Sequence, residues 1–277
     1  MSDVLTPRHA LTLRPEQPWF VLSAEQHYSV IASEHPAISH FYSFNVAQTA
    51  SQTMAVPDGC VDILFDCNAS SPTGRVCGTT LEARSAELIS GHHYFGVRFV
   101  PGVIPDFLDL MAEEITDREF SFLDVIPGSR LALEQIVETP LFSRKIELFN
   151  RNFTPRLLRK SSASTPGVIQ AIHQQRGNIR MEQLEALTGY SCRTLQRQFR
   201  HDTGMSPKAF SRIIRCQSAL NTLHQHGSMT SSDLAFDLGF SDQSHFLREF
   251  KKLVSTTPLD YQRRIAQEIY DERIRYN

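Results

Sequence analysis

The spacing of hydrophobic residues changes part-way along this chain of 277 residues. Between residues 19 and 100, short apolar stretches at 19–22, 61–65 and 94–100 are separated by clusters of Pro, Gly, Asn and Ser. Short apolar stretches punctuated by turn-forming residues are typical of β-strands. The last stretch runs into Pro101-Gly102, which predicts a turn at its end. This part is therefore expected to be β-rich.

From Asp106 onward the period becomes helical. Phe107, Leu108, Leu110 and Met111 fall on one face of a helix, and residues 129–149 continue the pattern. The pattern predicts a small β-barrel or sandwich at about 15–104, with two or three helices at about 105–155. The helices around 131–149 form a dimer interface, cover the sheet, or do both, and we expect the protein to form a homodimer.

A polar stretch divides the chain. Residues 159–166 are small and polar and end in Pro166, a composition that predicts a solvated, mobile linker. We expect an α+β protein of two domains: an N-terminal domain at 1–160, a linker at 161–166 and an all-α domain at 167–277.

The helical part contains an internal repeat. Residues 195–210 recur at 246–261, so that Phe199 corresponds to Phe250 and Pro207 to Pro258, a constant offset of 51 residues. Upstream, residues 189–191 match 239–241 with an offset of 50. Agreement of this density indicates a duplicated unit.

Each copy has the pattern of a helix-turn-helix. The first has a short helix at 181–187, Gly189 for the turn and Ser191 as the cap of a second helix. The second copy has a helix at 232–238, Gly239, and Ser241 or Asp242 as the cap. A helix from Pro207 to about residue 225 joins them. At ~1.5 Å per residue it spans roughly 27 Å, close to the ~34 Å between successive major grooves.

The outward faces of the two second helices carry residues suited to DNA. Arg pairs with guanine and Gln with adenine in the major groove, and the remaining basic residues suit phosphates. The alternative is a solvated amphipathic face, which the duplication disfavours. The candidate DNA-binding residues are Arg193, Gln196, Arg197, Arg200, Gln243, Ser244, His245, Arg248 and Lys251.

The distribution of charge supports this interpretation. Residues 161–277 hold 15 of the 28 basic and 11 of the 30 acidic residues of the chain. A basic C-terminal part therefore follows an acidic N-terminal part, which favours a polyanion binder attached to a domain that is not one.

Residues 166–265 resemble the DNA-binding domain of the AraC/XylS family of bacterial transcription regulators. The most specific stretches are 195–207 and 233–252. The family pattern has Gly before the second Thr-Pro, whereas this chain has Ser255, so the turn there is expected to be altered. The resemblance places base contacts at Arg193, Gln196 and Arg197 in the first unit. In the second unit it places them at Gln243, Ser244, His245 and Arg248, with His245 alternatively only packing.

Residues 56–65 and 96–102 are more loosely similar to a cupin-related subgroup of regulatory domains. This likeness implies a β-barrel that holds a small molecule and helices that dimerise. The AraC/XylS resemblance implies a cytoplasmic transcription regulator, most commonly an activator that contacts RNA polymerase, with repression as the alternative. The ligand, its binding residues and the promoter are not predicted.

Other candidate chemistry in the N-terminal part is weak. His92 and His93 would point to opposite faces of a strand, and the cupin His-x-His pattern is absent, so no metal or cofactor is expected. Asp62 and Asp66 could share a face without an acid–base partner. Arg98 either binds an anionic ligand or, as we favour, faces solvent or forms an internal ion pair.

We expect a cytoplasmic protein that is not an enzyme. The start of the chain lacks the pattern of a secretory signal, no stretch is long and apolar enough to span a membrane, and the five cysteines are expected to be reduced. Two alternatives are kept: a metal-dependent cupin enzyme, and a DNA-repair protein that carries an AraC-type module. Cys60, Cys67 and Cys77 are too few and poorly spaced for the thiol chemistry of such a repair protein.

Overall fold

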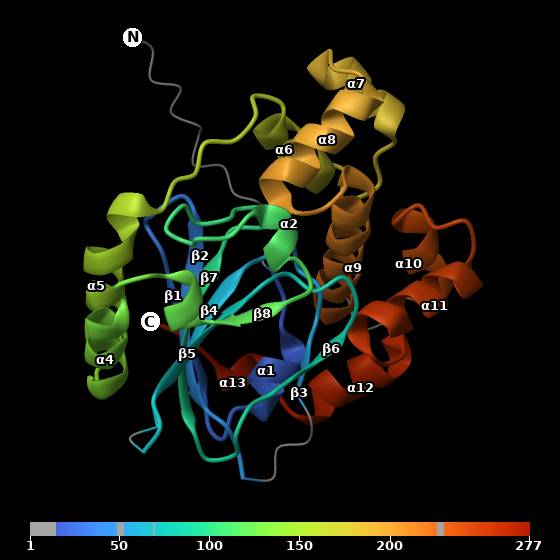
Figure 1. Ribbon diagram of the computed structural model, residues 1–277. Helices are drawn as coiled ribbons and strands as arrows, with labels where there is room; N and C mark the ends of the chain where they lie inside the picture. The colour runs from blue at the N-terminus through green and yellow to red at the C-terminus, as the bar shows by residue number, and fades with distance from the viewer. Residues whose placement is uncertain (1–14, 49–52, 69, 226–229) are drawn as a thin grey trace.

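The computed structural model describes residues 15–48, 53–68, 70–225 and 230–277. Its centre is a seven-stranded sheet in the order β8-β5-β4-β7-β2-β1-β9 (Figure 1). The strands are β1 (Tyr28–Ala32), β2 (Ile38–Asn45), β4 (Asp62–Asp66), β5 (Thr73–Cys77), β7 (His93–Phe99), β8 (Glu119–Ser121) and β9 (Ile274–Tyr276). Two further strands, β3 (Thr53–Ala55) and β6 (Arg84–Ala86), form a separate pair.

The structure does not confirm the expected β-barrel. Within the described residues the seven-stranded sheet is open, with β8 at one edge and β9 at the other. All its pairs are antiparallel except β1 and β9, which are parallel. The strands predicted at 61–65 and 94–100 are confirmed as β4 and β7, which pair side by side.

The apolar stretch at 19–22 is a helix, not the strand that was predicted. It forms α1 (Pro18–Ser23), with Pro18 in the first turn, where a missing N–H costs no hydrogen bond. Every residue of α1 is buried. A continuous apolar run fits a helix buried on all sides as well as a buried strand, so the pattern could not separate the two.

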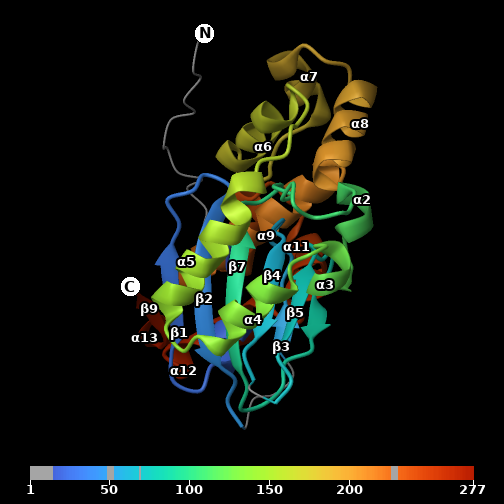
Figure 2. The same cartoon turned by 60° about the vertical axis from the view of Figure 1, so that its left-hand side comes forward.

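Helices cover one face of the sheet (Figure 2). The segment 129–149 forms α4 (Arg130–Glu138) and α5 (Phe142–Phe153), interrupted around Pro140. Their inner faces join a buried cluster with Phe65, Phe95 and other side chains of the strands. The helix predicted from Asp106 begins only at α2 (Ala112–Ile115); residues 106–111 form turns. A short α3 (Phe122–Val125) and a 3-10 turn (Thr154–Arg156) complete this part.

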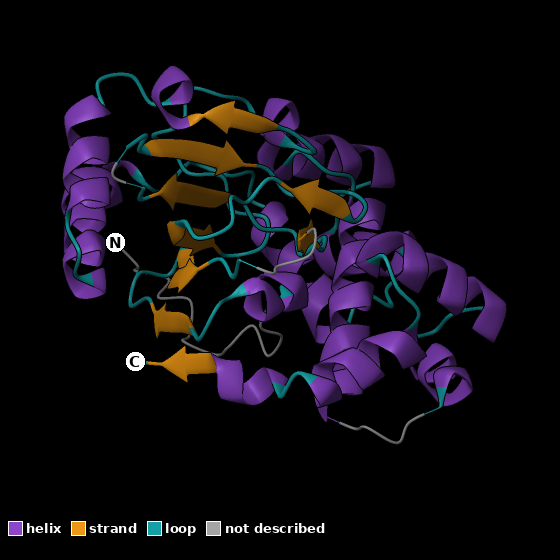
Figure 3. Ribbon diagram, turned by 90° about the horizontal axis from the view of Figure 1, so that it is seen from below, coloured by secondary structure: helices purple, strands orange, loops and turns teal. Residues whose placement is uncertain are grey.

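From residue 165 to residue 273 the chain is helical as predicted, but β9 lies inside the predicted all-α domain at 167–277 and joins the N-terminal sheet. Figure 3 shows the strands between two groups of helices. The helices are α6 (Thr165–Gln174), α7 (Met181–Thr188), α8 (Cys192–Thr203), α9 (Pro207–Gln225), α10 (Ser231–Asp237), α11 (Gln243–Val254), α12 (Pro258–Gln267) and α13 (Tyr270–Arg273). None of the helices in the described ranges is long and apolar enough to cross a membrane.

The segment at 161–166, which its composition predicts to be a solvated linker, is partly buried: Ser164 and Thr165 are buried, whereas residues 161, 163 and 166 are exposed. The Ser162 backbone N–H and the Thr165 hydroxyl both donate to Asp202 Oδ2, at 2.8 and 2.6 Å. The Ser164 hydroxyl donates to Gln198 at 2.7 Å. Small hydroxyl side chains are typical of linkers, but here they supply donors to one carboxylate and one amide on α8.

Two of the three hydrophobic clusters belong to a single structural part, and the third does not. One lies between the sheet and helices α4 and α5, and one lies inside the first helix-turn-helix unit. The third combines Trp19, Phe20 and Tyr42 of the N-terminal part with Phe250 and Tyr261 of the second unit. The second helix-turn-helix unit and the N-terminal part therefore share one core.

Candidate nucleic-acid interface

The first helix-turn-helix unit consists of α7 and α8. Gly189 ends α7 with a φ of 73°, the left-handed conformation that a tight turn requires and that glycine adopts without strain. The Ser191 hydroxyl then accepts a hydrogen bond from the backbone N–H of Thr194 and caps α8. The turn and the cap predicted from the sequence are both confirmed.

The second unit consists of α10 and α11. Gly239 lies in the turn with a φ of 70°, and Asp242, rather than Ser241, caps α11. The Asp242 carboxylate accepts from the backbone N–H of His245 at 2.7 Å. This hydrogen bond, with a second from the Ser241 hydroxyl, lowers the pKa of Asp242, so that the cap stays charged.

Helices α8 and α11 each bury one face and expose the other. Leu195 and Phe199 on α8, and Phe246 and Phe250 on α11, are buried. Eight of the nine candidate DNA-binding side chains are exposed: Arg193, Gln196, Arg197 and Arg200 on α8, and Gln243, Ser244, Arg248 and Lys251 on α11. With the offset of 51 residues, three of these positions on α8 correspond to three on α11: 193 to 244, 197 to 248 and 200 to 251.

His245 is the exception. It is half-buried, its ring lies edge-on to Phe240 with centroids 5.4 Å apart, and its Nδ1 is 3.2 Å from the Ser241 hydroxyl. This placement agrees with the alternative in which His245 packs against its own unit.

A groove of about 650 Å³ separates the two units alongside α9. Met181 and Leu184 of α7 line one side, and Phe246 and Phe250 of α11 line the other. Helix α9 has 19 residues, hence roughly 28 Å of length, and its buried side chains contribute to the cores of both units. The predicted joining helix is therefore present.

Glutamates of the N-terminal part reach the ends of both candidate recognition helices. Arg200 lies 3.5 Å from Glu113 of α2, and Lys252 lies 2.6 Å from Glu82. Lys252 and these glutamates were not among the predicted residues. Nothing in the spacing of Glu82 or Glu113 indicates that the fold brings them to these helices.

The chemical candidates of the N-terminal part have ordinary partners. His92 pairs with Asp66 at 2.8 Å, and His93 lies 2.7 Å from the Ser43 hydroxyl on another strand, so the two rings diverge as predicted. No group of three or more His, Cys, Asp or Glu within the described ranges could hold a metal ion. Arg98 forms an internal ion pair with Asp62 at 2.7 Å, which confirms the favoured interpretation.

Comparison with known proteins separates the two parts of the chain. Residues 184–264 match a family model described as a helix-turn-helix domain, and residues 35–121 match one described as a domain of unknown function (DUF6597). The HTH-type transcriptional activator RhaS of Klebsiella pneumoniae (strain 342) is 33% identical over 79 residues. RhaS of Escherichia coli O157:H7 is 34% identical over 70 residues.

The match to the family model identifies the kind of domain in the C-terminal part. Residues 184–264 are an AraC-type helix-turn-helix domain. The alignment with the Klebsiella RhaS covers 28% of this chain and 28% of that protein, so the chain spans little more than a quarter of the length of that relative.

Solved structures match either the C-terminal part alone or most of the chain. A probable AraC family transcriptional regulator from Rhodopseudomonas palustris is 31% identical and covers 37% of this chain and 97% of its own, with a TM-score of 0.34. ToxT from Vibrio cholerae is 11% identical and covers 86% of this chain and 92% of its own, with a TM-score of 0.41.

Proposed function

We propose that the protein is a sequence-specific DNA-binding regulator of transcription. The observation that carries the proposal is the duplication: two capped helices, α8 and α11, expose equivalent polar and basic side chains and are joined by α9. One such face would fit a solvated helix. Two such faces, held by the same joining helix α9, fit a protein that places one helix in each of two successive major grooves.

In this proposal Arg193, Gln196 and Arg197 of α8 read bases, as do Gln243, Ser244 and Arg248 of α11. Arg200 and Lys251 bind phosphates, which fix the register and supply salt-sensitive affinity. His245 supports α11 by packing and has no assigned base. Because the named relatives are transcriptional activators, activation through contact with RNA polymerase in the cytoplasm is part of the proposal.

The N-terminal part is proposed to sense a small molecule, to self-associate, or both. Leu131 and Leu141 are 65% and 64% exposed on the helical layer, which supports a contact between two copies there. The inner faces of the same helices are buried against the sheet, so the layer covers the sheet whether or not it dimerises.

The proposal is tested by selecting duplexes from a random pool with the full-length protein. A shared sequence in two segments about one helical turn apart is expected. Arg197→Ala and Arg248→Ala should each cost about 1–3 kcal/mol of specific binding, since a bidentate base contact is lost. Arg144→Ala is the matched control, because it removes an exposed arginine of α5 that is paired with Glu147.

Unchanged affinity in both α8 and α11 variants would refute the assigned recognition faces. Stoichiometric zinc or iron in the purified protein would contradict the whole proposal and favour a metal-dependent enzyme.

A further inference from the structure

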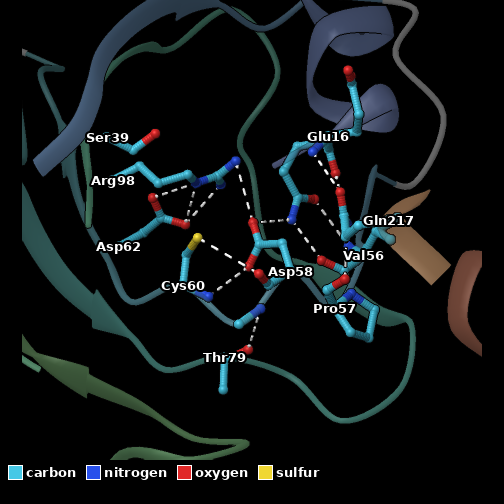
Figure 4. Close-up of polar contacts among 12 residues, drawn as sticks. Glu16, Ser39, Val56, Pro57, Asp58, Cys60, Asp62, Thr79, Arg98 and Gln217 are labelled. Carbon is cyan, nitrogen blue, oxygen red and sulfur yellow. Dashed lines mark hydrogen bonds and ion pairs between the residues drawn. The ribbon is translucent and has the colours of Figure 1, made fainter. Parts of the chain in front are cut away.

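The two sequence stretches that resemble regulatory domains meet at one buried place. Asp62 on β4 lies opposite Arg98 on β7 in the strand register. The Arg98 guanidinium is within 2.7 Å of Asp62 and 3.4 Å of Asp58, and its side chain is only 3% exposed. Figure 4 shows Arg98 between the two carboxylates. This cluster anchors the segment 56–62 to the sheet.

Asp58 extends the cluster toward the helical part. Its Oδ2 accepts from the Gln17 side-chain amide at 2.9 Å, and its Oδ1 accepts from the backbone N–H of Cys60 at 2.9 Å. The Gln17 amide also donates to the Val56 carbonyl at 2.6 Å and accepts from the Val56 N–H at 2.9 Å. Gln17, Asp58 and Arg98 are buried, so displacement of this segment would leave polar groups without partners and away from water.

The network ends on α9, the helix that joins the two helix-turn-helix units. The Gln217 amide donates to the Pro57 carbonyl at 2.9 Å, and its oxygen accepts from the Glu16 backbone N–H at 2.7 Å (Figure 4). Gln217 is 1% exposed. It lies two helical turns from Phe210, on the same side of α9, and Phe210 packs directly on Gly59 of the anchored segment.

The close packing at Gly59 shows how little freedom this contact has. A Cβ added there would come within 2.9 Å of the Phe210 ring, and Gly59 has a φ of 79°. Gly102, in the turn after β7, would likewise bring a Cβ within 2.8 Å of Ile169 on α6. The N-terminal part thus contacts the joining helix and the first unit, while Trp19 and its neighbours contact the second.

A groove separates the two helix-turn-helix units beside α9. The relative orientation of the units therefore depends on α9 and on the contacts that each unit makes with the N-terminal part. Resting on the proposed DNA-binding function, we propose that Gln217 and the buried Arg98–Asp58 pair are positioning residues for the two recognition helices. They fix α9 against the N-terminal sheet, and so set the spacing and rotation at which α8 and α11 meet DNA. A change in the sheet at Arg98 reaches the DNA-binding surface by this route.

The experiment measures preference for spacing rather than affinity alone. The probes are a duplex selected by the full-length protein and two derivatives with one base pair added or removed between its two segments. One base pair shifts a segment by about 3.4 Å along the axis and rotates it by roughly a tenth of a turn. We expect the unaltered protein to bind the derivatives on the order of tenfold more weakly.

Gln217→Leu is expected to reduce that discrimination to about twofold while retaining binding to the selected duplex, because α9 loses its fixed position. Asp58→Asn, which keeps the side-chain volume, should act in the same direction and covers the case in which Gln217→Leu fails to fold. Ser218→Ala is the matched control, because the Ser218 hydroxyl is buried on the same helix and donates only within it, to Ile214.

The outcomes distinguish failure of the proposed DNA-binding function from failure of the positioning role. If no duplex is selected, the proposed function fails. If one is selected and both variants keep the tenfold discrimination, or weaken binding to all three duplexes by the same factor, the positioning role is overturned. Retained discrimination in Ser218→Ala, with loss in the other two variants, supports it.

Discussion

Ser255 adopts a left-handed backbone conformation, and the equivalent position in the first unit is occupied by a glycine. Ser255 ends α11 with a φ of 66°, and Gly204 ends α8 with a φ of 77°. The altered turn expected from the sequence is therefore not altered in geometry. The backbone has the conformation that glycine adopts at this position, and the Cβ of Ser255 is strained against its own backbone.

Ser255→Gly should consequently stabilise the protein by about 1 kcal/mol, because relief of the left-handed strain exceeds the entropy that glycine adds to the unfolded chain. Denaturant unfolding of the full chain measures the change. Gly189→Ser is the reciprocal variant. It has a φ of 73° and nothing within 4 Å of an added Cβ, so it should lose a comparable amount from strain alone. A decrease in stability for Ser255→Gly would contradict this account.

His173 on α6 is a buried histidine whose two ring nitrogens have no hydrogen-bond partner among the residues that the structure describes. Its ring lies edge-on to Phe210 with centroids 5.7 Å apart. Burial lowers the pKa of His173 to about 4. The folded state therefore favours the neutral ring, whereas the unfolded chain takes up a proton near pH 6.5.

Stability from this residue is complete above the unfolded pKa and is lost as the pH falls from about 6.5 toward 4, by roughly 3 kcal/mol at the lower end. His173→Phe should flatten this part of the profile of unfolding free energy against pH. Urea titrations at several pH values test it. An unchanged acid slope in the variant would show that other groups produce it.

At the scale of the element, the helices of the second half were predictable and the strands less so. Helices α8 and α11 each begin at a capping side chain and end at a residue with a positive φ, Gly204 or Ser255, and the duplication gave two readings of each position in the repeated unit. The stretch at 19–22 and the turns at 106–111 were misassigned because four to six apolar residues carry no period of their own.

The candidate site shows the same limit. The exposed faces of α8 and α11 follow from the spacing of buried Leu and Phe, so the sequence was enough to find them. The contacts of Gln217, Glu82 and Glu113 depend on how distant segments pack, and no local pattern encodes that packing.

Gly204 and Gly189 end neighbouring helices of the same unit, and they should respond differently to alanine. Both have a positive φ, but an added Cβ at Gly204 would come within 2.2 Å of the Ala112 carbonyl on α2, while Gly189 is open. Gly204→Ala should therefore displace α8 from α2 and lower the unfolding free energy by about 1–3 kcal/mol more than Gly189→Ala does. Hydrogen exchange across α2 locates the effect, and equal losses without change at α2 would argue against this contact.

At the scale of the whole molecule, the shared core joins what the sequence presents as separate domains. Trp19 is 6% exposed, and its indole donates to the Val254 carbonyl at 3.0 Å. Its ring meets Tyr261 edge-on, with Arg264 4.8 Å above it. The indole of an N-terminal helix is thus part of the second DNA-binding unit.

Trp19 is also the only tryptophan of the chain, so its fluorescence reports on this junction. In a denaturant titration, the emission shift of Trp19 should coincide with the loss of far-ultraviolet helical signal, because the second unit cannot keep its core once the junction opens. An emission change that precedes the loss of helix would show instead that the two parts separate while both remain folded.

The strand β9 has a consequence for synthesis. It pairs with β1, placing Ile274 beside Tyr28 and Tyr276 beside Val30. On the ribosome, β1 and β2 emerge long before residues 274–276, and until then one edge of β1 offers its free backbone groups to any other extended chain. The newborn protein therefore passes through a period in which its sheet can pair with a neighbouring chain, and this period lasts until β9 pairs with β1.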